Sequence, residues 1–467
     1  MRKRLVVGSV CMATVAVASP AWAQEVTAET VQANLDIVFL AMASAFVLLM
    51  HPGFALLECG FGRSKNAAHI IMKNLMTLCL GLMTYFAVGF ALMYGTQAAG
   101  LVGTDGFFLL GLASYEPVTG GSLSIDFLFQ AMFAATAATI VSGACAERMK
   151  FGPYLIVVVG MTGLVYPVIG AWKWGGGWLN DLGFLDFAGS TVVHLTGGVA
   201  ALVAAAILGP RIGKYDASGK PRAIPGHSVP LGVLGALLLF FGWMGFNGGS
   251  TLGAGDGFLI ADVLVATVLA GGAGGTAAAL YTRLRYGKYD VGMTANGLLA
   301  GLVGVTAGAD VLNNLGALAV GLIAGVVVVI AVGVVDRLGV DDPVGAVAVH
   351  GVCGALGTVW VGLAHTTDGL LYGGGVRLLA VQVLGVVAAG AFVALATGLV
   401  VGAMRATVGI RVTEQEELEG LDIYEHGMYG YPELALGPQA FPGGPHPSLD
   451  HADPSGVGAP PARAMSE

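Results

Sequence analysis

The chain has 467 residues, of which 11% are charged and 56% are hydrophobic, and its mean hydropathy is +0.79. Because an average soluble chain is roughly one-quarter charged, this composition excludes a soluble globular protein. The isoelectric point near 5.6 and the lack of a basic stripe exclude nucleic acid as a partner. Glycine accounts for 75 residues, which in an apolar chain indicates helices packed backbone to backbone.

The N-terminal segment has the features of a secretion signal. Arg2, Lys3 and Arg4 precede an apolar run, and Ala21-Trp22-Ala23 fits a small-residue cleavage site. We therefore expect residues 1–23 to be a cleavable signal peptide. An uncleaved first helix is the alternative, but the apolar run is short for a membrane span.

Residues 24–410 contain a series of apolar segments, each about long enough to cross a bilayer. The pattern predicts an all-α polytopic membrane protein with eleven transmembrane helices. The predicted spans are residues 34–60, 67–95, 123–147, 153–174, 190–210, 228–250, 258–283, 292–310, 313–336, 345–364 and 377–404.

Basic residues predict how these spans are oriented. The odd-numbered connections hold twelve Lys and Arg residues, whereas the even-numbered ones hold only Arg377. Positively charged loops stay in the cytoplasm, so the mature N-terminus is expected outside the inner membrane and the C-terminus inside. Residues 411–467 then form a cytoplasmic tail, which is strongly acidic and, after about residue 436, rich in Pro and Gly and expected to be disordered.

Two histidines mark an internal repeat. Val192-Val193-His194 in the fifth predicted span is echoed by Ala348-Val349-His350 in the tenth, and glycines follow both. The histidines lie five spans apart, an odd number, which predicts two five-helix repeats of inverted topology with the eleventh helix as an addition. A titratable group within the membrane usually faces a cavity or a partner, although two unrelated glycine-rich helices could each carry one histidine.

Several ordered motifs resemble those of the ammonium transporter family (Amt/Mep/Rh), specifically its bacterial Amt branch. They are Gly53-Phe54-Ala55, Gly62-Arg63-Ser64-Lys65-Asn66, Cys145-Ala146-Glu147-Arg148, Trp174-Gly175-Gly176-Gly177, the run from Asp186 to His194, the run from Gly242 to Ser250, Asp341-Asp342-Pro343, and His350-Gly351-Val352-Cys353-Gly354. The resemblance implies a homotrimer with one pore per subunit, and nitrogen assimilation by ammonium transport without a cofactor or enzymatic activity.

The resemblance also implies an external site that recruits ammonium. An aromatic face can replace part of the cation's hydration, and a hydroxyl can accept a hydrogen bond from it. Phe133, Trp174 and Ser250 are the expected members. The alternative is that Trp174 belongs to the interfacial belt and Phe133 to the core.

A gate and a proton relay are expected below that site. By resemblance, Phe133 and Phe246 stack to close the pore, with Phe129 one helical turn from Phe133. His194 and His350 are expected to meet as a hydrogen-bonded pair that relays a proton while ammonia passes. A metal site is the competing chemistry, but two histidines without a third ligand make a poor zinc centre.

Three acidic positions have different expectations. Asp186, just before the fifth span, is expected to cap free backbone amides in a structural and electrostatic role. Glu58 is an intramembrane acid without a predicted role beyond packing or a subunit contact. Some relatives carry an acid where this chain has Gly345, so the sequence predicts that the tenth span lacks a second acidic cap.

The tail begins with Thr413-Glu414-Gln415-Glu416, which fits a capping box and a short helix that ends at Gly420. By resemblance, the tail packs beneath a neighbouring subunit and binds a PII-type signal protein. An ammonium sensor, a membrane enzyme using the two histidines, and a Rhesus-type gas channel are the alternative functions. The enzyme lacks a nucleophile or a full metal shell.

Overall fold

The computed structural model describes residues 27–432, so the expected signal peptide and the expected disordered end of the tail lie outside the described residues. The first half comprises α1 Ala28–Leu48, α2 Met50–Phe61, η1 Ser64–Asn66, α3 Ala67–Thr84, η2 Tyr85–Gly89, α4 Phe90–Tyr94, β1 Gln97–Ala98, β2 Val102–Gly103, η3 Phe107–Leu109, α5 Leu123–Ala144, α6 Phe151–Gly160, η4 Met161–Val165, α7 Tyr166–Lys173, α8 Trp178–Asp181, η5 Ser190–Leu195 and α9 Thr196–Leu208. The second half comprises α10 Val229–Gly249, α11 Gly257–Tyr286, α12 Val291–Thr306, α13 Asn314–Arg337, η6 Val347–Val352, α14 Cys353–Ala364, η7 Leu370–Tyr372, α15 Arg377–Thr407, α16 Glu414–Glu419 and α17 Leu421–His426.

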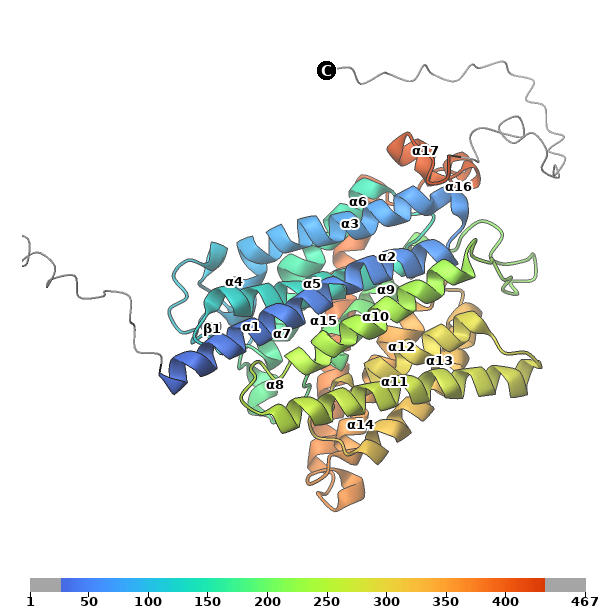
Figure 1. The fold of residues 1–467 in the computed structure, drawn as a ribbon. Helices are drawn as coiled ribbons and strands as arrows, with labels where there is room; N and C mark the ends of the chain where they lie inside the picture. The colour runs from blue at the N-terminus through green and yellow to red at the C-terminus, as the bar shows by residue number, and fades with distance from the viewer. Residues whose placement is uncertain (1–26, 433–467) are drawn as a thin grey trace, which may run out of the picture. The chain divides into compact units, whose positions relative to one another are not determined.

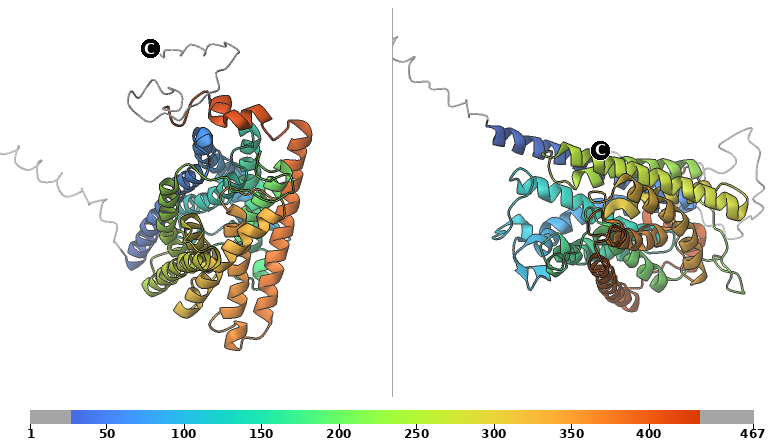
Figure 2. Two further views of the ribbon diagram at one scale, coloured as in Figure 1. Left: turned by 90° about the vertical axis from the view of Figure 1, so that its right-hand side faces the viewer. Right: turned by 90° about the horizontal axis from the view of Figure 1, so that it is seen from below.

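Long helices make up most of this part of the chain (Figure 1). Ten helical runs in the described residues are long and apolar enough to cross a membrane. The other expected span, residues 292–310, is helix α12, which is apolar but only 16 residues long. The prediction of an all-α polytopic membrane protein is therefore confirmed. The long helix α15 runs along one side of the bundle (Figure 2).

Side-chain caps explain where many helices begin. A hydroxyl, amide or carboxylate oxygen just before the helix accepts a hydrogen bond from a backbone N–H of its first turn. The residues that do so are Thr27, Ser228, Asp256, Asp290, Asn313 and Thr413. The last belongs to the capping box that the sequence predicts at α16, in which Glu416 also accepts from the Thr413 N–H.

Glycines let the helix backbones approach closely. A Cβ atom on Gly198 of α9 would lie 2.1 Å from the backbone nitrogen of Gly351 in η6, far inside van der Waals contact. On the other side of the bundle, a Cβ on Gly325 of α13 would lie 2.2 Å from the carbonyl oxygen of Gly274 in α11. The expectation of backbone-to-backbone packing is confirmed at these crossings.

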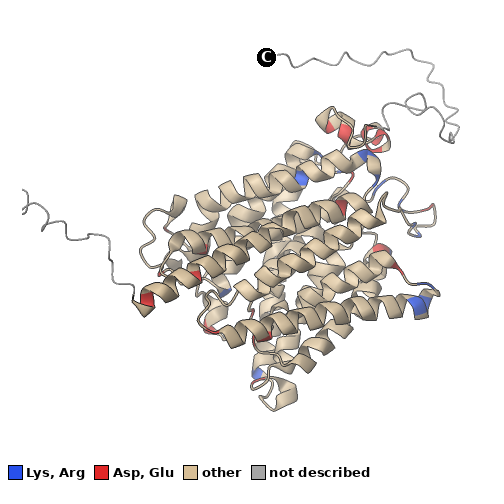
Figure 3. Cartoon of the chain, in the orientation of Figure 1, with Lys and Arg blue, Asp and Glu red and all other residues tan. Residues whose placement is uncertain are grey.

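A buried ion-pair cluster ties loops together at one end of the bundle. Glu147 accepts from Arg63 Nε at 2.7 Å and from Arg211 Nη1 at 3.0 Å, and Arg211 Nε also contacts Asp341 at 2.8 Å. Most of the Lys and Arg residues gather at this end, which we call the basic end (Figure 3). We call the end that carries Trp174 the aromatic end.

Breaking this cluster should destabilise the fold. Glu147→Gln removes a negative charge that compensates the buried positive charge of Arg211. Removing one partner of a buried ion pair costs about 3–5 kcal/mol of folding free energy. We expect a clear drop in the melting temperature of detergent-solubilised protein, followed by fluorescence. Glu414→Gln, at an exposed position in the tail, is the control and should leave the melting temperature unchanged.

The same cluster predicts an acid sensitivity. Burial raises the pKa of Asp341, but the Arg211 hydrogen bond and the charges of Arg148 and Arg211 lower it from 3.8 to about 2. A carboxyl group with a depressed pKa in the folded state contributes stability that is present above pH 3.8 and is lost as the pH falls towards 2.

The described part of the tail packs against the basic end of its own chain. Asp422 accepts hydrogen bonds from the backbone nitrogens of Ala68 and His69 at 3.0 and 2.8 Å, so it caps the start of α3. Lys65 Nζ donates to the Glu417 carbonyl oxygen at 2.7 Å. These contacts link the acidic tail to the loop between α2 and α3.

Candidate functional site

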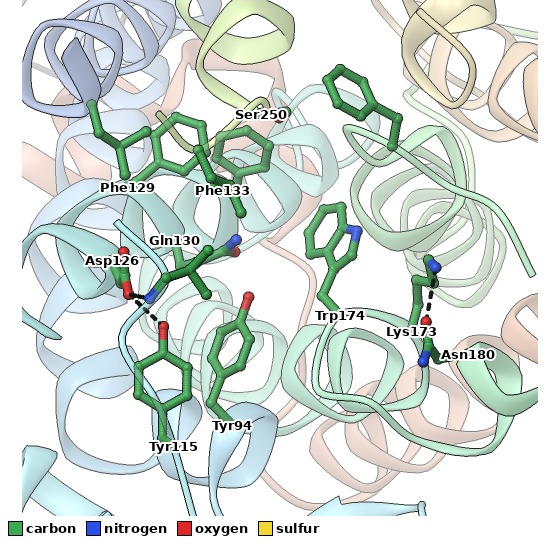
Figure 4. Close-up of a pocket in the computed structure, with 14 residues that line it drawn as sticks. Tyr94, Tyr115, Asp126, Phe129, Gln130, Phe133, Lys173, Trp174, Asn180 and Ser250 are labelled. Carbon is green, nitrogen blue, oxygen red and sulfur yellow. Dashed lines mark hydrogen bonds between the residues drawn. The ribbon is translucent and has the colours of Figure 1, made fainter. Parts of the chain in front are cut away.

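A pocket of about 280 Å³ opens at the aromatic end, and the residues expected to recruit ammonium line it (Figure 4). Phe133 comes from α5, Trp174 follows α7, and Ser250 follows α10. The Ser250 hydroxyl donates to the Phe246 carbonyl oxygen at 2.8 Å, which leaves its lone pairs available to accept from a cation. The structure therefore brings all three predicted residues together.

An aromatic stack lies at the base of this pocket. The rings of Phe133 and Phe246 are 4.0 Å apart between centroids and nearly parallel, at 19°. Phe129 contacts Phe133 at 4.6 Å, and Trp174 meets Phe133 edge-on at 6.1 Å. Phe129, Phe133 and Phe246 are each at most 1% exposed, so the stack separates the pocket from the interior of the bundle.

His194 and His350 meet beyond the stack. Their Nδ1 atoms are 3.2 Å apart, and the rings are nearly parallel with centroids 5.2 Å apart. His194 also stacks on Phe246 at 5.4 Å and on Trp243 at 5.1 Å. Trp243 was not predicted, although it lies three residues before Phe246 and so on the same helical face.

The histidine pair is buried among apolar and aromatic groups. His194 is fully buried and His350 is 4% exposed, and the Nε2 atom of His194 has no hydrogen-bond partner among the described residues. One Nδ1 atom can donate to the other only if the two imidazoles hold different tautomers. In the described part of the chain no three His, Cys, Asp or Glu side chains are placed to hold a metal ion.

Asp186 holds the turn that leads to His194. Its carboxylate accepts from the backbone nitrogens of Gly189, Thr191 and Val192 at 2.8 to 3.1 Å. Its carbonyl oxygen accepts from the Trp174 indole at 2.9 Å, which links the helix start to the pocket at the aromatic end. Burial raises the pKa of Asp186 to about 6, although the three N–H groups and the Lys173 charge lower it.

The second half repeats this arrangement, so the expectation that the tenth span lacks an acidic cap is wrong. Asp342 accepts from the backbone nitrogens of Gly345 and Val347 at 3.1 and 2.7 Å. Gly345 has a φ of +83°, as Gly189 has +110°, and both conformations suit glycine. Asp342 is therefore the second cap, and it stands eight residues before His350, as Asp186 stands before His194.

The pocket also has polar side chains in its lining that the sequence analysis did not predict. Asp126 accepts from the Tyr115 hydroxyl at 2.7 Å and from two backbone nitrogens, so it fixes the loop at the pocket mouth (Figure 4). Gln130 accepts from the Tyr166 hydroxyl at 3.1 Å. Their helical spacing from Phe133 could have predicted that Asp126 and Gln130 lie on the same face of α5 as Phe133.

Lys173 adds a positive charge to the rim. It lines the same pocket as Trp174, and its Nζ donates to the Asn180 side-chain oxygen at 3.0 Å (Figure 4). Asp310 lies with Lys173 beside a neighbouring pocket of about 240 Å³, and burial raises the pKa of Asp310 to about 6. Hydropathy placed Lys173 at the end of a predicted span and did not indicate that it lies at the rim of a pocket.

Residues 38–431 match the Ammonium Transporter Family. Ammonium transporter Amt2 of Archaeoglobus fulgidus is 41% identical, over 92% of this chain and 96% of the relative, and ammonium transporter Amt1 of Haloferax mediterranei is 42% identical, over 88% and 82%. A solved structure titled Sensor Amt Protein is 39% identical with a TM-score of 0.81, covering 85% of this chain and all of the other. Mep2 of Candida albicans is 33% identical with a TM-score of 0.75, covering 82% and 87%. On these matches and on the helical fold, the chain belongs to the ammonium transporter family.

Proposed function

We propose that this protein carries ammonium across the inner membrane by capturing the cation, removing its proton and passing ammonia through the pore. The proposal rests on the order of the groups from the pocket towards the interior of the bundle. Trp174 and Ser250 line an open pocket, Phe133 and Phe246 stack below it, and the histidine pair follows.

Each group has a chemical task in this proposal. Aromatic faces replace part of the water around ammonium, and the Ser250 hydroxyl accepts a hydrogen bond that ammonium can donate and potassium cannot. The phenylalanine stack and the apolar surroundings then admit ammonia rather than an ion, because burying an unpaired charge is costly. The imidazoles of His194 and His350 take up and hand on the proton. Potassium cannot lose a proton and is excluded at this step.

The orientation follows from the distribution of charge. We propose that the basic end faces the cytoplasm and the aromatic end the outside, because basic loops remain in the cytoplasm. A cleaved N-terminal signal, a homotrimer with one pore per subunit, and a PII-type protein that binds at the tail complete the proposal. The contacts of Asp422 and Lys65 would place such a partner near the start of α3.

The direct test is current across a solid-supported membrane that carries the purified protein. Pulses of ammonium should give a current, and matched pulses of potassium should not. Absence of an ammonium current, with binding still measurable, would contradict electrogenic transport.

Trp174→Leu tests the recruitment pocket. Loss of the indole removes cation–π attraction of about 0.5–2 kcal/mol, so ammonium should half-saturate the current at a several-fold higher concentration. The advantage over potassium should fall in parallel. Trp178→Leu, in the adjacent helix α8 but outside the lining of this pocket, is the matched control. Unchanged half-saturation and selectivity would remove Trp174 from the site.

A sensor that binds ammonium without conducting it is the second candidate. One observation favours it, the similarity to the structure titled Sensor Amt Protein. The positive charge of Lys173 at the rim of the pocket opposes cation entry in either function. Lys173→Val separates the two functions. A conducting protein should gain ammonium affinity without the lysine, whereas a protein that remains without current would support the sensor.

A further inference from the structure

Glu58 of α2 is a buried carboxyl group that the proposed mechanism does not use. It is 1% exposed. Its Oε2 atom accepts from Ser142 Oγ at 2.6 Å and from Asn74 Nδ2 at 3.1 Å, whereas Oε1 has no partner among the described residues. Leaving a carboxylate oxygen buried and unpartnered is costly, so such an atom points to a ligand that the protein binds there.

A small pocket lies beside this carboxyl group. It measures about 20 Å³, enough for about one water molecule, and Glu58, Asn296 and His350 are among its lining residues. The Asn296 amide nitrogen donates to the Val344 carbonyl oxygen at 3.2 Å, which leaves its side-chain oxygen to accept from a ligand. The pocket therefore joins the histidine pair to two oxygen acceptors.

This pocket is the inverted counterpart of the recruitment pocket. His194 lies beside Phe246 of the other half, with ring centroids 5.4 Å apart. His350 lies beside Phe54 of the other half, with ring centroids 5.8 Å apart. In both halves the fourth residue after that phenylalanine lines the pocket, one helical turn further on. The corresponding residues are Phe246 and Ser250 at the recruitment pocket, and Phe54 and Glu58 at the second pocket.

The third helix of each half shows the same correspondence. Gln130 and Phe133 of α5 line the recruitment pocket, and Asn296 and Leu299 of α12, with the same spacing of three, line the second. The polar position thus carries an amide in both halves. Ser250 at the recruitment pocket corresponds to Glu58 at the second pocket. The carboxyl group of Glu58 interacts more strongly with a cation than a hydroxyl does.

A compensating charge lies close to the carboxyl group. Lys73 of α3 is fully buried, and its Nζ donates at 2.8 Å to the carbonyl oxygen of Ser142, the residue whose hydroxyl donates to Glu58. Thr139 donates to Asn74 at 2.7 Å and completes the network. The network holds Oε2 in place, and Oε1 stays available to the pocket.

We propose that Glu58 and Asn296 form a second ammonium site, at which the carboxyl group of Glu58 returns the relayed proton to ammonia. A water in the pocket accepts a proton from the imidazolium of the histidine pair and gives one of its own protons to Glu58 Oε1. Ammonia leaving the pore then takes that proton. The step regenerates the carboxylate and the neutral imidazoles and releases one ammonium ion, which Asn296 helps to coordinate.

The inference rests on the proposed transport function, and Glu58→Gln tests it. Glutamine keeps the shape and can still accept from Asn74 and Ser142, but it cannot carry the proton. We expect the maximal ammonium current to fall by about 100-fold, the lower range for a positioned proton-transfer group. The half-saturating ammonium concentration, which the recruitment pocket sets, should not change.

Thr139→Val is the matched control, because it removes a hydrogen bond from the same network and leaves the carboxyl group in place. It should keep most of the current. A Glu58→Gln current equal to that of the unmodified protein, or an equal loss in both variants, would overturn the proposal. Glu58→Asp should recover part of the current. If the unmodified protein gives no ammonium current, the transport function fails before Glu58 is considered.

Discussion

Replacing His194 and His350 together by alanine is expected to reduce the ammonium-specific current by at least about 100-fold. The two Nδ1 atoms lie 3.2 Å apart, so each imidazole can receive a proton from the other. Alanine removes both carriers and leaves an apolar gap that a proton crosses poorly. The current on a solid-supported membrane after an ammonium pulse measures the effect.

The control for this variant is His51→Ala. His51 is 4% exposed and also lacks hydrogen-bond partners among the described residues, but it lines neither the pocket at Trp174 nor the pocket at Glu58. This variant tests whether the loss of any buried imidazole disturbs the helix bundle. We expect His51→Ala to keep the ammonium current. An undiminished, ammonium-selective current in the double variant would refute the proton relay.

Asp186→Ala is expected to destabilise the protein by several kcal/mol and to lower its yield. The substitution leaves the three backbone N–H groups of Gly189, Thr191 and Val192 buried without an acceptor, at about 1–3 kcal/mol each. The total is several kcal/mol, a large part of the stability of a typical domain. The yield of monodisperse protein in detergent and its melting temperature measure the effect.

The second half supplies a graded comparison. Asp342→Ala leaves two backbone N–H groups, those of Gly345 and Val347, without an acceptor. Because Asp186→Ala affects three such groups, Asp342→Ala should lower the melting temperature less. Asp186→Asn keeps one accepting oxygen and should fall between the unmodified protein and Asp186→Ala. If all three variants melted at the temperature of the unmodified protein, these caps would not stabilise the helix starts.

Hydropathy predicted the membrane-spanning helices well, because lipid requires long apolar runs whose backbone groups pair internally. It placed the end of the span at residues 292–310 too late, because the apolar pattern continues past the end of α12 at Thr306. Ala307 and Gly308 are apolar but lie in a turn, and the Ala307 N–H bonds the Ser190 hydroxyl instead of continuing the helix. This contact depends on a residue more than a hundred positions away.

The candidate site was predicted in part. Resemblance and helical spacing selected Phe129, Phe133, Trp174, Phe246 and Ser250, and the structure places them around one pocket and its base. The same reasoning looked for the second cap at position 345, where some relatives carry an acid and this chain has glycine. It therefore missed the Asp342 carboxylate. A one-dimensional pattern does not show which backbone amides a carboxylate reaches.

The sequence by itself determined that the chain is a helical membrane protein with a repeated histidine motif, because composition and periodicity are local properties. Family resemblance predicted that His194 and His350 meet, but the contact itself is tertiary, since it depends on the close crossing of α9 and η6 at Gly198 and Gly351. Tertiary structure also left Glu58 Oε1 without a hydrogen-bond partner among the described residues. Such contacts join residues far apart in the chain, and they arise only when packed helices bring the side chains together.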